Sequence, residues 1–300
     1  MAQICPTSKP EKLLLPTDGS EFSEGAIREA ISLAKSCSSK LIAVSVIETN
    51  PEYETLAPQL VEKAEKEART HLEAVKSRAE KEGVQCEIIA RQGDEPYKYI
   101  IEEAEKNNVS MIIMGRRGRT GLKRLMMGSE TARVIGHAPC NVVVVPRAAK
   151  LEFRSVLVAT DGSRFSDAAA AEAINIAKLC GAAFTVISVV PSEAMSPFDI
   201  VHSEMQKGSI VERELAEGEK NVKKVKELAE KEGIKTTGLV CAGRPYEAIL
   251  EAAKEKRADL IVVGSHGRTG LARLLMGSVT ERVIGHAECA VLVVKVYISY

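Results

Sequence analysis

The sequence contains no tryptophan, and aromatic residues make up only 4% of its 300 residues. It also has no excess of charge of either sign, because 41 Lys and Arg residues balance 41 Asp and Glu residues. A balanced surface lacks the basic patch with which proteins bind nucleic acid or anionic membranes, so we expect neither partner. No apolar run approaches the roughly 18–20 residues of a membrane-spanning helix, and the first ten residues lack the apolar segment of a signal peptide. We therefore expect a cytoplasmic protein.

Seven cysteines are present, but no two of them form a Cys-x-x-C pair. Most stand beside short apolar runs, as Cys140 and Cys289 do. Small thiols in such positions are typical of the core of a reduced intracellular protein. We therefore expect free, buried thiols rather than a metal or redox site.

The chain is an internal duplication. Thr17-Asp18-Gly19-Ser20 recurs 143 residues later as Thr160-Asp161-Gly162-Ser163, within segments that share 13 identities in 22 residues. Residues 115–146 recur 149 residues later at 264–295, with 22 identities in 32. The larger second offset indicates a net insertion of six residues in the second copy, which we place in 191–210, where turn-forming residues gather. A repeat of this length predicts two domains of one fold, residues 1–148 and 149–300.

Each copy alternates short apolar runs with amphipathic segments. The runs in the first copy predict five strands, and each has a counterpart in the second copy; they lie at 13–15, 41–47, 86–91, 111–114 and 142–145, and at 156–158, 184–190, 235–241, 260–263 and 291–294. Between them, apolar residues recur at helical spacing, most clearly on the face of a long helix that carries Leu60, Ala64, Ala68, Leu72, Val75 and Ala79. Nearly continuous apolar strands separated by helices predict an α/β fold with a parallel sheet covered on both faces. Such sheets bind ligands beyond the carboxyl ends of their strands.

A glycine loop of fixed spacing follows the fourth predicted strand of each copy. It consists of Gly-x-x-Gly, nine further residues and Gly-Ser, at 115–129 and again at 264–278. Glycines let main-chain N–H groups approach an anion, and the helix start that follows attracts phosphate. The serine either caps the helix or donates to the same phosphate, so the spacing alone also fits a tight turn before a capped helix. Neither loop has the Walker A or the dinucleotide-binding pattern, which disfavours a P-loop NTPase or a Rossmann dehydrogenase.

The loop residues at 114–121, and still more closely those at 264–271, resemble the ATP-binding sequence of the universal stress protein family. The Thr-Asp-Gly-Ser turns and the His-Ala-x-Cys-x-Val-x-Val segments at 137–144 and 286–293 are similar to that family too. This resemblance implies two tandem doubly wound domains, each with a five-stranded parallel sheet in the order 3-2-1-4-5 flanked by helices. It further implies ATP, AMP or ADP, with any Mg²⁺ carried by the phosphates, over the carboxyl ends of strands one and four. The two domains would pair within the chain through residues 141–146 and 290–295, and two chains would associate as a homodimer.

The same resemblance implies a set of nucleotide contacts in each domain, the base and ribose meeting the turn and the second strand, and the phosphates meeting the loop. In the first domain these residues are Pro16, Thr17, Asp18, Val46, Met114, Gly115, Arg117, Gly118, Gly128 and Ser129. In the second they are Ala159, Thr160, Asp161, Val189, Val263, Gly264, His266, Gly267, Gly277 and Ser278. The loops differ where Arg116-Arg117 stands in place of Ser265-His266. Two extra cations beside the phosphates would strengthen binding in the first domain or favour a more highly charged nucleotide.

Several side chains allow more than one interpretation. The aspartates of the two turns either contact ribose or a phosphate-bound metal ion, or stabilise the turn, and both roles can coexist. The arginines that follow the glycine loops are equally suited to phosphate contact and to solvation; they are Arg119, Arg124, Arg268 and Arg273. We expect His137 and His286 to pack near the last strand, and His71 and His202 to be solvated.

Three hypotheses of function follow. The first is a stress-response regulatory or sensing module that binds adenine nucleotide, favoured because the loops lack the P-loop lysine and the sequence fixes no general base. The second is a slow Mg²⁺-dependent ATPase or nucleotidyl transferase that uses the same site. The third is a structural pairing module without nucleotide dependence, based on the apolar strands at 141–146 and 290–295. The sequence predicts binding and leaves catalysis open.

Overall fold

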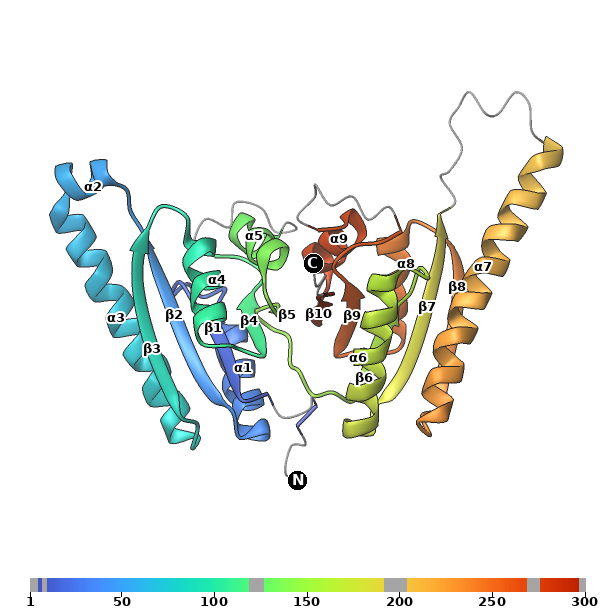
Figure 1. The fold of residues 1–300 in the computed structure, drawn as a ribbon, viewed down its shortest axis with the longest axis horizontal. Coiled ribbons are helices and arrows are strands. Elements are labelled where there is room, and N and C mark those ends of the chain that lie inside the picture. Colours follow the sequence, from blue (N-terminus) through green and yellow to red (C-terminus); the bar gives the residue numbers. More distant parts are fainter. Residues whose placement is uncertain (1–4, 7–9, 119–126, 192–203, 269–275, 297–300) are drawn as a thin grey trace.

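The computed structural model describes residues 5–6, 10–118, 127–191, 204–268 and 276–296 (Figure 1). The first half consists of β1 (Lys12–Pro16), α1 (Glu24–Cys37), β2 (Lys40–Glu48), α2 (Pro51–Leu56), α3 (Pro58–Lys81), β3 (Cys86–Gly93), α4 (Pro96–Lys106), β4 (Met111–Gly115), α5 (Ser129–His137) and β5 (Asn141–Val145). The second half consists of β6 (Ser155–Ala159), α6 (Arg164–Cys180), β7 (Ala183–Pro191), α7 (Glu204–Lys231), β8 (Thr236–Gly243), α8 (Pro245–Glu255), β9 (Leu260–Gly264), α9 (Ser278–His286) and β10 (Ala290–Val294). The short helix α2 is an element that the sequence patterns did not predict.

All ten strands form one sheet in the order β3-β2-β1-β4-β5-β10-β9-β6-β7-β8. Within each half the strands are parallel and follow the predicted order 3-2-1-4-5, which is confirmed. At the centre β5 and β10 are antiparallel, and Val143 pairs with Leu292, its own counterpart in the repeat. The predicted pairing of the halves through these strands is therefore confirmed, and a pseudo-twofold axis passes between the two residues. The association of two whole chains stays a prediction.

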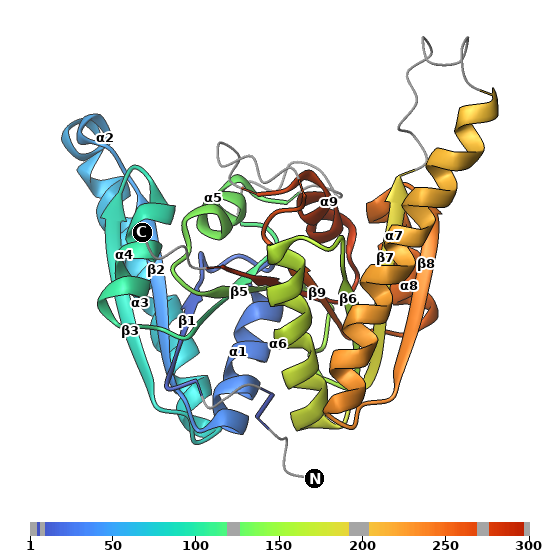
Figure 2. The same cartoon turned by 45° about the vertical axis from the view of Figure 1, so that its right-hand side comes forward.

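Helices cover both faces of the sheet, and the apolar core lies beneath them in two layers (Figures 1 and 2). Because successive strand residues point to opposite faces, Leu13 belongs to the layer under α1, α3, α6 and α7, and Leu14 to the layer under α4, α5, α8 and α9. Both layers continue through the central strands, with Val143 and Leu292 in the first and Val142 in the second. The halves thus share one core.

The segment that joins the halves is packed against α1. Leu151 is 3% exposed, and its main-chain N–H donates to Glu29 Oε2 at 3.0 Å. The neighbouring Arg28 guanidinium donates to the main-chain oxygen of Ala149. Gly25 has no room for a side chain, because a Cβ there would lie 2.7 Å from Pro146 O. The predicted domain boundary at residue 148 falls inside this packed segment, and its position stays a prediction.

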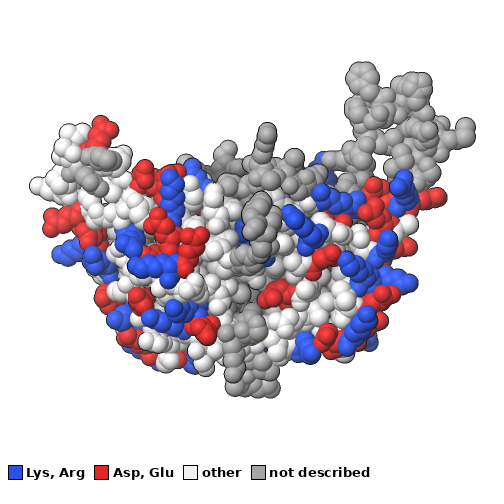
Figure 3. Space-filling view, viewed as in Figure 1, with Lys and Arg blue, Asp and Glu red and all other residues white. Residues whose placement is uncertain are grey.

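Charged side chains of both signs are interspersed over the face of the molecule that Figure 3 shows, in keeping with the balanced composition. Many of them form exposed ion pairs, such as Lys224 with Asp167 at 2.8 Å. Such pairs contribute little to stability. In the parts of the chain that the structure describes, no helix has the length and apolar character needed to cross a membrane.

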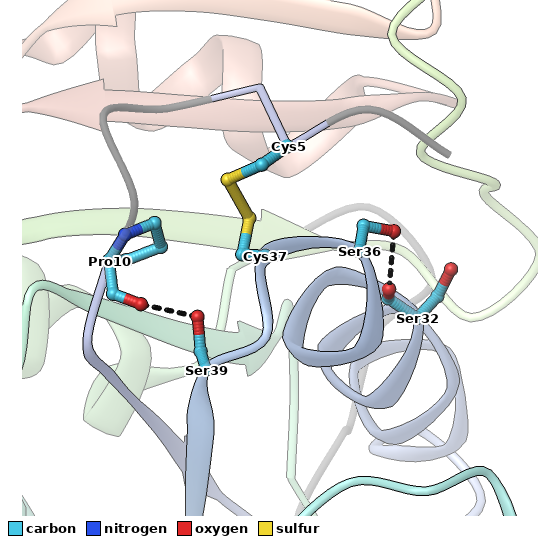
Figure 4. The surroundings of a disulfide bond; sticks show 6 residues. All are labelled: Cys5, Pro10, Ser32, Ser36, Cys37 and Ser39. Carbon is cyan, nitrogen blue, oxygen red and sulfur yellow. Dashed lines mark hydrogen bonds between the residues drawn. A yellow bond between two sulfur atoms is a disulfide. The ribbon is translucent and has the colours of Figure 1, made fainter. Parts of the chain in front are cut away.

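Cys5 and Cys37 form a disulfide, which corrects the expectation that all seven thiols are free (Figure 4). The fold returns the N-terminal segment to the end of α1, where Ser39 Oγ donates to Pro10 O, and this brings the two sulfurs together. The two cysteines are separated by 32 positions and belong to no motif, so the sequence carried no signal of the pairing. The remaining five cysteines are free, and burial raises the pKa of Cys140 and of Cys289 to about 12.

Replacing Cys5 by serine should lower the free energy of unfolding by about 2–4 kcal/mol, because the unfolded chain loses a cross-link that closes a long loop. Cys180 occupies the position of Cys37 in the second half and is free, so Cys180→Ser is the matched control, with an expected change below about 1 kcal/mol. Urea unfolding measures both. Dithiothreitol should remove the difference between wild type and Cys5→Ser, and equal stability before reduction would contradict the disulfide.

Candidate functional site

Each half places its Thr-Asp-Gly-Ser turn at the carboxyl end of its first strand. In the first half Thr17 N–H continues the strand ladder to Val44 O at 2.9 Å. Gly19 then has a φ of 75°, a conformation that costs glycine little. Asp18 Oδ1 accepts hydrogen bonds from Ser20 N–H at 3.0 Å and from Ser20 Oγ at 2.8 Å. The turn-stabilising role considered for this aspartate is therefore present.

The second oxygen of each aspartate lies against the glycine loop of its own half. A Cβ at Gly118 would lie 2.8 Å from Asp18 Oδ2, and one at Gly267 would lie 2.9 Å from Asp161 Oδ2. In the second half, Arg268 N–H also donates to Asp161 Oδ2 at 2.9 Å. The middle glycine of the loop thus lies where the carboxylate passes the backbone, and turn and loop form one unit.

The first glycine of each loop has a packing role. A Cβ at Gly115 would lie 2.9 Å from the main-chain oxygen of Phe22, just before α1, and the loop carbonyl of Gly115 accepts a hydrogen bond from Thr131 Oγ1 at 3.2 Å. In the second half Thr280 Oγ1 donates to Gly264 O at 2.8 Å. These contacts fix the end of the fourth strand against α1 and α5 or their counterparts, so this glycine alone would not indicate a ligand.

The third glycine of each loop begins a helix. Gly128 is the N-cap of α5, and Gly277 is the N-cap of α9. Their N–H groups donate to Arg116 O and Ser265 O, both at 2.9 Å. Glycine has no side chain with which to cap the helix, and Ser129 and Ser278 are the first helical residues, so the interpretation of the following serine as the cap is wrong. The first N–H groups of a helix have no intrahelical partner and carry its positive end, which suits a phosphate.

The apolar residues of the candidate set lie on the same face of the sheet as these helix starts. Met114 and Val263 are 6% and 4% exposed. Val46 and its counterpart Val189 are partly buried against the layer under α4, α5, α8 and α9, as is Ala159. The structure therefore brings the turn, the second strand and the helix start of each half to one edge and one face.

Arg116 does not point toward the phosphate position of its own loop. Its Nη1 donates to Gly285 O at 3.0 Å and to Ala287 O at 2.9 Å, at the end of α9 in the other half. Burial, and to a smaller extent the charge of Arg117, lower the pKa of Arg116. The expectation of two extra cations beside the phosphates is therefore wrong for Arg116, because its long side chain reaches across the central strands to carbonyl groups at a helix end.

The histidines differ from the expectations drawn from the sequence. His71 is partly buried, and its Nε2 lies 2.9 Å from Thr17 Oγ1, which corrects the expectation of a solvated residue. Its place within the apolar face of the long helix was the missed signal. His266 stacks on Phe165 at 5.2 Å. His137 and His286 are exposed, and their rings contact those of Tyr97 and Tyr246 on the neighbouring helices rather than the last strand.

Four further residues that the sequence singled out lie outside the described residues; they are Arg119, Arg124, His202 and Arg273.

A cavity of about 660 Å³ lies at the opposite edge of the second half, with Lys178, Lys235 and Lys256 in its lining. The last turns of α6, α7 and α8 surround it, and such helix ends carry partial negative charge, which the lysines offset. Lys178 also pairs with Glu232 at 2.5 Å. The cavity offers no helix start to an anion, so the glycine loops remain the candidate site.

Within the described ranges, no three His, Cys, Asp or Glu side chains gather in a group that would hold a metal ion.

Fold and site together define a duplicated, doubly wound α/β domain with a glycine loop at the carboxyl edge of each sheet half. The model of the universal stress protein family matches residues 10–146 and 152–295. The chain therefore belongs to this family and carries its domain twice.

Individual relatives agree with this membership. The chain is 46% identical to a universal stress protein of Methanocaldococcus jannaschii over 143 residues, which are 48% of this chain and 82% of the relative. It is 32% identical to universal stress protein YxiE of Bacillus subtilis over 156 residues, 48% of this chain and 99% of the relative. A solved universal stress protein structure from Archaeoglobus fulgidus is 26% identical and has a TM-score of 0.72, covering 96% of this chain and 99% of the other. The A. fulgidus protein thus resembles both halves together, and the two sequence relatives each match about half of the chain.

The first two loop glycines should respond differently to alanine. Gly115→Ala should lower the free energy of unfolding by about 1–3 kcal/mol, because its Cβ meets main-chain atoms that cannot move away cheaply. Gly118→Ala should change it by less than about 1 kcal/mol, because its Cβ meets only the end of the Asp18 side chain, which can rotate. Urea unfolding of both variants compares them. Equal losses would show that the middle glycine also serves packing.

Proposed function

We propose that each half binds an adenine nucleotide, ATP or its relatives AMP and ADP, at the carboxyl edge of the sheet. The chain would act as a cytoplasmic regulatory or sensing module of the stress response. The observation that carries this proposal is the uncapped start of α5 and of α9, each closed by the glycine loop of its own half. Two helix starts of this kind on one edge offer main-chain donors and positive charge to two phosphate chains.

The residues present fit a nucleotide in both halves. In the first half the phosphates would meet Gly118, Gly128 and Ser129, Asp18 would bond a ribose hydroxyl, and Val46 would adjoin the base. Ser129 is exposed, so its hydroxyl and the N–H groups of its turn are accessible to a ligand. Any Mg²⁺ would arrive on the phosphates and neutralise part of their charge.

The second half has the same arrangement, and there Arg268 contacts the turn. Arg268 holds Asp161 through two hydrogen bonds, from its N–H to Oδ2 and from its Nε to the main-chain oxygen, both at 2.9 Å. Its guanidinium also lies 3.7 Å from Glu214 and Glu217 on α7. A carboxylate oxygen can accept a second hydrogen bond, so Asp161 keeps capacity for a ribose hydroxyl. We propose that Arg268 orients this carboxylate and does not contact phosphate.

Aspartate in place of the first serine of each helix should abolish one site at a time. Ser129→Asp puts a negative charge where the phosphate would lie, so Mg²⁺-ATP affinity at the first site should fall at least about tenfold, while the charge favours the helix itself. Ser278→Asp should do the same at the second site, and the double variant should bind at neither. Isothermal titration calorimetry counts the sites and measures each affinity.

Ser77→Asp, at an exposed position within α3, adds the same charge away from the loops and should leave both sites intact. Mass spectrometry of small molecules released from the purified protein identifies any nucleotide already bound. If wild type neither carries nor titrates an adenine nucleotide, the proposal is wrong. Phosphate release measured in the same samples tests turnover separately.

A further inference from the structure

Two partly buried cations reach across the central β5–β10 pair in opposite directions. Arg116 follows β4 of the first half and donates to Gly285 O and Ala287 O at the end of α9. Lys295 follows β10 of the second half, and its Nζ donates to Ile135 O at 2.7 Å and to Gly136 O at 3.1 Å, at the end of α5. Each half therefore supplies a cation to the last turn of a helix in the other half.

Both cations are partly buried. Burial lowers the pKa of Lys295, as it does that of Arg116. The Lys295 main chain is fixed as well, because its N–H donates to Asn141 Oδ1 at 3.0 Å. A buried cation is tolerated when it meets carbonyl oxygens at the negative end of a helix, and there it stabilises the helix dipole.

The helices that receive these cations are the ones whose starts form the candidate phosphate positions. Each has nine residues, a length of about 13 Å, so fixing one end restricts the other. A cation at the carboxyl end and a phosphate at the amino end also act on one helix dipole with the same favourable sign. The end that Arg116 holds therefore belongs to the second site, and the end that Lys295 holds belongs to the first.

Within the described residues, each loop is linked to the helix of the other half through a cation. Arg116 O accepts the N–H of Gly128 in its own site, while the side chain of the same residue bonds α9. In the second loop Ser265 N–H donates to Val294 O at 3.2 Å, next to Lys295, which bonds α5. The equivalent positions in the repeat carry different residues, Ser265 in place of Arg116 and Pro146 in place of Lys295. The two contacts between the halves therefore come from different positions in the repeat, one from the loop after the fourth strand and one from the residue after the fifth strand.

We propose that Arg116 is a positioning residue for the nucleotide site of the second half, and that Lys295 is a positioning residue for the site of the first half. This inference rests on the proposed function. Neither side chain contacts the nucleotide; each holds the far end of the helix that does. Removing Arg116 thus weakens binding in the half that does not contain it.

The test uses the full-length chain with one site silenced at a time. In the Ser129→Asp background only the second site remains, and Arg116→Ser, which copies Ser265, should weaken its Mg²⁺-ATP affinity about three- to tenfold. Lys295→Met should change that same affinity by less than about twofold, because its contact lies on the other helix. In the Ser278→Asp background only the first site remains. There Lys295→Met should weaken the affinity about three- to tenfold, and Arg116→Ser should change it by less than about twofold. Arg116→Lys, which keeps the charge, should recover much of the affinity that Arg116→Ser loses.

A positioning residue weakens nucleotide binding only at the site of the opposite half, whereas a general loss of contact between the halves would weaken both sites. If Arg116→Ser weakens both sites equally, or mainly the site of its own half, the inference is wrong. The same holds if neither substitution changes either affinity although the single-site backgrounds bind nucleotide, and the proposed function then stands. Absence of binding in wild type and in both backgrounds would overturn the proposed function and this inference together.

Discussion

The antiparallel pairing of β5 with β10 is the constraint on which the rest of the molecule depends. It joins two five-stranded parallel sheets into one, and both core layers pass through it. Because its central pair is Val143 with Leu292, counterparts in the repeat, the halves face each other symmetrically. The pairing also brings the ends of α5 and α9 within reach of side chains from the opposite half. Without it Arg116 and Lys295 would not reach a helix end of the other half, and two partly buried cations would lack the carbonyl groups that accept their hydrogen bonds.

The glycine loop combines three requirements that a sequence pattern cannot separate. At the first glycine a Cβ would meet the residues before α1, and at the second it would meet the aspartate carboxylate. The third glycine is the N-cap of a helix whose first N–H groups have no intrahelical partner. A conserved spacing in both halves therefore reflects packing as much as recognition. The part of the loop that points to phosphate binding is the uncapped helix start, and the turn aspartate beside it is already engaged in the turn.

Most of the fold followed from the sequence, because the repeat fixed the number of units and the apolar runs fixed the strands. The order 3-2-1-4-5 came from the resemblance to a family, and the structure bears it out. The features that the sequence did not indicate all depend on contacts between distant segments. Cys5 meets Cys37 only because the N-terminal segment returns to the end of α1. The Arg116 side chain bonds α9 only because the pairing of β5 with β10 places the end of α9 beside it. His71 was accessible to prediction, since a polar residue on the apolar face of a helix needs a partner, and Thr17 provides it.

Fusion of the two domains in one chain explains why the crossing contacts differ. In a dimer of identical chains every contact across the twofold axis occurs twice, so one residue type must serve both sides. A duplicated chain is free of that restriction. Here the first half contacts α9 of the other half with Arg116, which lies inside its loop. The second half contacts α5 with Lys295, which follows its last strand, and has Ser265 at the loop position. The first loop is therefore linked to the other half by its own Arg116 side chain, whereas the second is linked through Lys295, beside the hydrogen bond from Ser265 N–H to Val294 O. The duplication has thus produced two sites of one architecture that are connected to each other by unequal means.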